Sequence, residues 1–204
     1  MSNGFDREFQ RLSNLAKQYG YAACVLNKEI HRQHTSPADS RPPVEHDAFT
    51  YLWVPSLQLS AHALECMVKA CAYLNGVKPP RSAKDGHDLN AMLSQPYGGM
   101  LRGRLLANAE IAAEALRQDG AYDLSTHDQL GFFDPANWLE AAISHLGNLH
   151  FQGGSMLRYG SDNADEKAPS SPLLADAVYL TTQDLGHAKH MFVSKPDVLG
   201  AGPG

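Results

Sequence analysis

The sequence predicts an all-α fold, an antiparallel up-and-down bundle of five to six helices. Alanine and leucine far outnumber valine and isoleucine, which favours helices over sheet. Apolar residues recur at three- and four-residue steps through most long segments, the spacing of one helix face. No long stretch alternates apolar with polar residues, as a half-buried strand would.

The chain is expected to form one domain. Its 204 residues, 43% of them hydrophobic, are enough for a single core and exclude wholesale disorder. We expect the domain to cover residues 1–194, with loops at 31–49 and 159–171 and a flexible tail at 195–204. No run approaches about 18 consecutive apolar residues, so no membrane contact is predicted.

Net charge and cysteine content limit the binding partners and the cellular compartment that the sequence predicts. A net charge of −5 argues against a protein that coats nucleic acid non-specifically, and leaves a local basic patch as the route to RNA. Cys24, Cys66 and Cys71 are odd in number and lack metal-knuckle spacing, so they are expected to be buried thiols. Residues 1–11 contain no apolar segment typical of a secretion signal, and a cytoplasmic location is expected.

The first two helices carry the clearest apolar stripes. One is expected from about residue 6 to 30, followed by a proline-containing loop at 31–48. The second is predicted to begin at Leu57, with Ser56 capping its free amides, and to end at Asn75-Gly76. Its stripe should make it the central, mostly buried rod of the bundle.

Four more helices are predicted from start and stop signals. A short helix opens at residues 85–88, buries Leu89 and is stopped by Pro96. The next covers about 101–118. Asp134, followed by Pro135, starts another, because a cap residue and a proline in the first turn are a common helix beginning. The last covers about 172–192.

Glu65 and Lys69 form an i,i+4 pair in the favourable order on the second helix. One interpretation is an ordinary surface pair, worth about 0.3–0.5 kcal/mol. The other is that Glu65 lies beside the apolar face and accepts a hydrogen bond from His87 or Arg158, because a partly buried carboxylate needs a partner. His87 can equally be an ordinary cap-region residue near the start of the next helix.

Two motifs in this region resemble those of the HEPN (higher eukaryotes and prokaryotes nucleotide-binding) superfamily. Glu65 and Lys69 match an E-x-x-x-K step before a glycine turn, and Gly86-His87-Asp88-Leu89 matches a G-H-x-L that opens the next helix. Arg158-Tyr159 resembles an Arg-Tyr pair of a later helix. The resemblance implies a helical bundle with Glu65, Lys69, His87 and Tyr159 in its polar core. It also implies frequent homodimerisation, and a role in RNA cleavage or as a partner of nucleotidyltransferases.

The ribonuclease branch of that superfamily uses an Arg-x(4–6)-His motif near a late helix. Arginine stabilises phosphoryl charge and histidine handles the 2′-hydroxyl proton, with no metal. No histidine follows Arg158 within reach. The favoured interpretation is a non-catalytic module in RNA- or nucleotide-associated interactions of a prokaryotic stress, toxin–antitoxin or defence system. The alternative is a metal-independent endoribonuclease that uses Arg158 with His87 or His150.

The one local basic cluster comprises Lys78, Arg81 and Lys84. It is either a solvated loop or a phosphate-contacting patch for RNA.

The ten histidines raise the question of a metal. His62 and Glu65 at i,i+3 supply two ligands on one helix face, whereas a site needs three or four. His187 and His190 share a face but have no carboxylate at metal-ligand spacing. The sequence therefore predicts neither a metal nor another cofactor.

Overall fold

The computed structural model of the chain describes residues 2–35, 48–80, 86–119, 134–151 and 171–193. All regular structure in these segments is helical, which confirms the predicted all-α bundle. The elements are α1 (Ser2–Thr35), α2 (Ala48–Leu74), α3 (Leu89–Leu93), α4 (Pro96–Asp119), α6 (Pro135–Phe151), α8 (Ser171–His187) and the 3-10 helix η3 (Lys189–Phe192).

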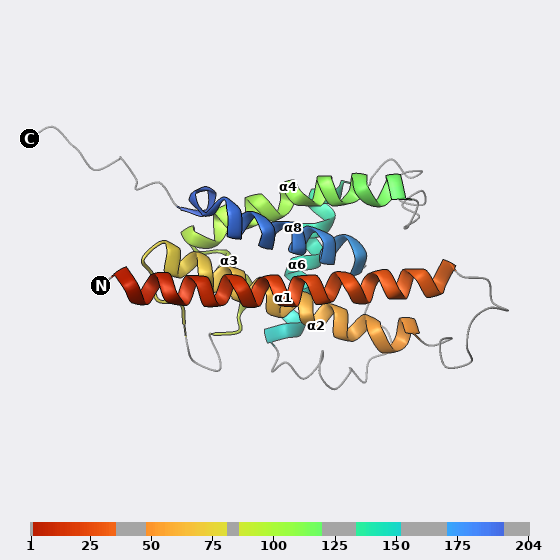
Figure 1. Cartoon of the computed structure of the whole chain (residues 1–204), viewed down its shortest axis with the longest axis horizontal. Helices are drawn as coiled ribbons and strands as arrows, with labels where there is room; N and C mark the ends of the chain where they lie inside the picture. The colour runs from red at the N-terminus through yellow and green to blue at the C-terminus, as the bar shows by residue number, and fades with distance from the viewer. Residues whose placement is uncertain (1, 36–47, 81–85, 120–133, 152–170, 194–204) are drawn as a thin grey trace, which may run out of the picture.

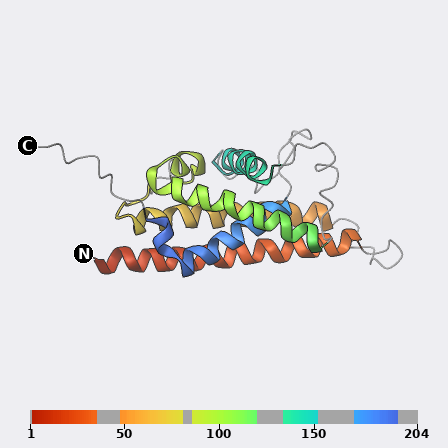
Figure 2. The same ribbon diagram turned by 90° about the horizontal axis from the view of Figure 1, so that it is seen from above.

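Four long helices run lengthwise and alternate in direction (Figure 1). Helix α1 lies along α2, its main partner, and α4 lies along α8. Helix α6 runs across this set and is seen nearly end-on when the molecule is turned (Figure 2). None of the described helices combines the length and the apolar character needed to cross a bilayer.

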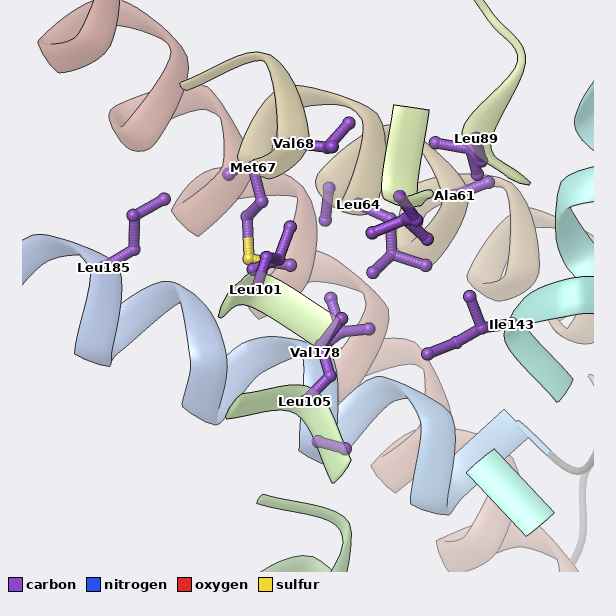
Figure 3. Packing of buried hydrophobic residues seen from close by; sticks show 14 of the residues in the cluster. Ala61, Leu64, Met67, Val68, Leu89, Leu101, Leu105, Ile143, Val178 and Leu185 are labelled. Atoms are coloured by element: carbon purple, nitrogen blue, oxygen red, sulfur yellow. The ribbon is translucent and has the colours of Figure 1, made fainter. Parts of the chain in front are cut away.

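The predicted central rod is the buried part of α2. Five residues of its predicted stripe, Leu57, Ala61, Leu64, Val68 and Cys71, are at most 1% exposed. Leu64 and Met67 meet side chains from α4, α6 and α8 in one continuous core (Figure 3). Burial of this apolar face stabilises the fold by about 25 cal/mol per Å² of apolar surface removed from water.

The predicted start of the second helix is wrong, because α2 begins at Ala48 and includes Pro55. Ser56 is not a cap. Its hydroxyl is buried against α1, where it donates to the Ala23 carbonyl (3.4 Å) and accepts from Asn27 Nδ2 (2.5 Å). Packing against a helix distant in sequence thus decides the conformation here, and local cap preference does not.

Other helix ends show which local signals hold. The Asp88 carboxylate accepts from the Ala91 amide (2.8 Å) and starts α3, and Asp134 accepts from the Asn137 amide (3.0 Å) at the start of α6, as predicted. Helix α2 ends at Leu74, directly before the predicted stop at Asn75-Gly76, and Gly76 has φ +72°.

Three other predicted bounds change. Helix α1 covers Ser2–Thr35, so the expected loop at 31–49 is helical at both edges. Pro96, expected only to stop α3, is also the first residue of α4. The last helix ends at His187 and continues as η3. The rest of the predicted loops (36–47 and 159–170) and the tail (195–204) lie outside the described residues.

Cys24 and Cys71 are buried free thiols, as predicted, whereas the free thiol of Cys66 is half-buried. Burial raises the pKa of the Cys71 thiol to about 12 and that of Cys66 to about 11. Both thiols are therefore neutral near pH 7 and weak as nucleophiles.

Candidate functional site

Glu65 is the centre of a compact polar cluster inside the bundle. Lys69 Nζ donates to Glu65 Oε1 at 2.5 Å. His87 Nδ1 donates to Glu65 Oε2 at 2.9 Å, and His150 Nε2 donates to the same oxygen at 2.7 Å. We call these four residues the Glu65 cluster. Both carboxylate oxygens are engaged, and the Glu65 side chain is only 11% exposed.

Helix α2 places Glu65 at the edge of the core. Half-buried residues of α2 around Glu65 recur at three- and four-residue steps and so lie on one face: Gln58, His62, Cys66 and Lys69. Glu65 adjoins this face but is itself buried. Its carboxylate therefore meets Lys69 one turn further on and faces the elements that cover α2.

The contact between α3 and α6 brings the two histidines to Glu65. His87 precedes Asp88, the cap of α3, and His150 lies near the end of α6. The Asn90 amide of α3 donates to the Ser144 carbonyl at 3.1 Å. Gly147 leaves room for the Asn90 side chain in this position, because a Cβ there would lie 2.6 Å from Asn90 Oδ1.

The electrostatics of the cluster favour an ionised Glu65. Burial alone would raise the pKa of this carboxyl. Hydrogen bonds from His150, Lys69 and His87 outweigh that effect and hold the pKa well below its usual range. Because the folded-state pKa is depressed, the Glu65 carboxylate contributes stability at neutral pH, and this contribution is lost progressively as the pH falls below the ordinary glutamate pKa of about 4.3.

His62 adds a third imidazole beside the cluster. It lies one turn before Glu65, and its ring meets the His150 ring edge to face with centroids 5.1 Å apart. The Tyr19 ring packs against His62 at 5.6 Å. One donor atom each from His62, Glu65 and His150 lie within 4.8 Å of one another, a spacing compatible with a metal ion.

The sequence interpretation named two partners for Glu65, and the structure places one of them. His87 contacts the carboxylate, whereas Arg158 lies outside the described residues. The sequence analysis did not identify His150 as a partner of Glu65. A signal for its burial existed: His150 is four residues after Leu146, on the inner stripe of its helix, and both are buried.

The remaining predicted site residues are not brought together by the described structure. Lys78 is exposed just after α2. Arg81, Lys84 and Tyr159 lie outside the described residues, as Arg158 does. The basic patch and the Arg-Tyr pair therefore stay predictions.

Two other polar features lie near α4. A pocket of about 280 Å³ between α3, α4 and α6 is lined by Asn90, Ser94, Arg102 and Glu140 among others, and Arg102 pairs with Glu140 across it. Deeper between α4 and α8, the Asp184 carboxylate accepts from Arg104 (2.6 Å) and Asn108 (2.8 Å).

Comparisons with protein-family models, curated proteins and solved structures find no match to this chain.

Proposed function

We propose that the chain is a non-catalytic, HEPN-like helical module that acts through RNA- or nucleotide-associated interactions. The observation that carries this proposal is the convergence of the two motifs. Lys69 of the first motif and His87 of the second both contact the Glu65 carboxylate, although 22 positions separate Glu65 from His87. Motif residues that jointly form a buried junction between helices support a role in shaping the fold.

The state of the polar side chains favours binding over catalysis. A general acid or base must reach a substrate proton within hydrogen-bond distance. His150 is 6% exposed and donates to an ionised carboxylate, and Lys69 is similarly engaged. His87, with a side chain 47% exposed, is the member of the cluster open to solvent.

The proposed contact for RNA is the basic segment that joins α2 to α3. It begins with the exposed Lys78 and continues in sequence through Arg81 and Lys84 towards His87. On a chain of net charge −5, such a segment offers a local group of cations for phosphate contacts. The same proposal includes a homodimer and a nucleotidyltransferase-type protein as an alternative partner, both of which the resemblance implies. It also includes the cytoplasmic location that was expected from residues 1–11 and from the cysteine content.

The test is RNA binding measured by fluorescence anisotropy, in EDTA and over a series of salt concentrations. We expect wild-type protein to bind a labelled single-stranded RNA and the Arg81→Ala/Lys84→Ala variant to lose at least about tenfold in affinity, with a shallower dependence on salt. The matched control is Arg7→Ala/Lys17→Ala, which removes the same charge from exposed positions of α1.

Two outcomes contradict the proposal. Absence of binding at low salt, or an equal loss in the α1 control, would show that the basic segment is no RNA contact. Cleavage of the RNA in EDTA that disappears in Arg158→Ala would instead establish the metal-independent endoribonuclease.

A further inference from the structure

We propose that His62, Glu65 and His150 bind one divalent transition-metal ion, best matched by zinc, between α2 and α6. This site goes beyond the proposed RNA association and does not depend on it. It also differs from the sequence prediction of no metal, because the third ligand comes from a helix distant in sequence.

The ligand geometry needs only side-chain adjustment. His62 and Glu65 lie on one face of α2, and α6 brings His150 opposite them, all three donor atoms within 4.8 Å of one another. Ligands about 2.0–2.1 Å from zinc at tetrahedral angles lie about 3.3 Å apart. The His150 Nε2 to Glu65 Oε2 distance is 2.7 Å, so an ion would replace the hydrogen in that contact as the pair opens slightly.

The donor set selects a class of ion. Two imidazole nitrogens and one carboxylate oxygen suit zinc and neighbouring first-row ions. Magnesium and calcium prefer an oxygen shell, which His62 and His150 do not provide. Three protein ligands leave one position for water, as in the His₂Glu zinc sites of proteins.

The surroundings hold the carboxylate in place for the ion. Lys69 occupies Glu65 Oε1, which leaves Oε2 towards the two imidazoles. His87 Nδ1 also contacts Oε2, and the His87 side chain is 47% exposed. Ligating carboxylates in proteins are commonly held by such outer hydrogen bonds, and loss of one costs about 10–100-fold in affinity.

The experiment is calorimetric titration of tag-free full-length protein with zinc. Cobalt(II) serves as the spectroscopic probe, because its visible absorption reports coordination. We expect one ion per chain, no competition by magnesium, and a Tm increase of about 5–10 °C at a hundredfold excess over Kd. His62→Gln should weaken zinc binding by about 100-fold or more, because it removes a ligand rather than an outer partner.

The matched control is His187→Gln/His190→Gln, which removes two exposed histidines at i,i+3 from the other end of the described chain. It should leave zinc affinity unchanged. The proposal is overturned if wild-type protein binds no zinc or cobalt at about 100 µM, or if the control variant loses binding while His62→Gln retains it.

A second measurement does not depend on a variant folding. Imidazole nitrogen shifts of wild-type protein, recorded by NMR with and without zinc, should change at His62 and His150 and stay fixed at His187 and His190. Zinc-dependent shifts confined to the latter pair would overturn the assignment.

Discussion

Replacement of Glu65 by glutamine tests whether the Glu65 cluster stabilises the bundle. The change keeps the side-chain shape and removes the charge that accepts from Lys69, His87 and His150. His150 is buried, so its contact is screened little, whereas the half-exposed His87 contributes less. Breaking a buried charged network by removal of one partner costs about 3–5 kcal/mol.

The assay is urea or thermal unfolding followed by circular dichroism, in EDTA so that no metal contributes. For a chain of this length, 1 kcal/mol shifts Tm by about 2–4 °C, so Glu65→Gln should lower Tm by about 6–20 °C. The control is Glu114→Gln on α4, a 60% exposed carboxylate, which should change stability by less than about 0.5 kcal/mol. A Glu65→Gln loss below about 1 kcal/mol would refute the reasoning.

Three further predictions concern separate features of the fold. His87→Ala should lower Tm by several degrees, since His87 joins the α2–α3 segment to Glu65; an unchanged melting curve counts against that role. Burial opposes ionisation of Asp184, but hydrogen bonds led by Arg104 depress its pKa, so the free energy of unfolding should fall as the pH drops below about 4. Asp184→Asn should reduce this loss of stability in acid, and an unaltered dependence of stability on pH would contradict the prediction. Gly98→Ala should destabilise the fold by about 1–3 kcal/mol in denaturant titration, because its Cβ would lie 2.5 Å from a backbone carbonyl oxygen. A Cβ at Gly103 meets no atom within 4 Å, so Gly103→Ala should be neutral or stabilising, and equal effects of the two changes would be contrary evidence.

Local sequence signals predicted the features that depend on interactions between residues close together in the chain. The stripe from Leu57 to Cys71 identified the buried rod, because apolar spacing reports directly on which face leaves water. Asp134 was identified as a cap because an aspartate followed by proline is a common helix beginning, and its carboxylate accepts from the amide three residues later. The short helix was predicted to open at residues 85–88, where Asp88 caps α3. These features need no knowledge of the rest of the chain.

Contacts between distant segments were beyond such signals. Serine is a residue type that commonly caps helices, yet α1 covers Ser56 and helix α2 continues through it. The Glu65–Lys69 pair reads equally well as an exposed pair or a buried one. The approach of His150, 85 positions later, determines that the pair is buried. Neither the helical period nor the HEPN-like motifs encode that contact.

A double-mutant cycle between Glu65 and His150 tests the central claim most directly. We expect Glu65→Gln and His150→Gln each to be destabilising, and the double variant to lose about 1–3 kcal/mol less than the sum of the two single losses. Losses that add to within about 0.3–0.5 kcal/mol would show that the two side chains do not interact, and the buried junction of α2 and α6 described here would be wrong.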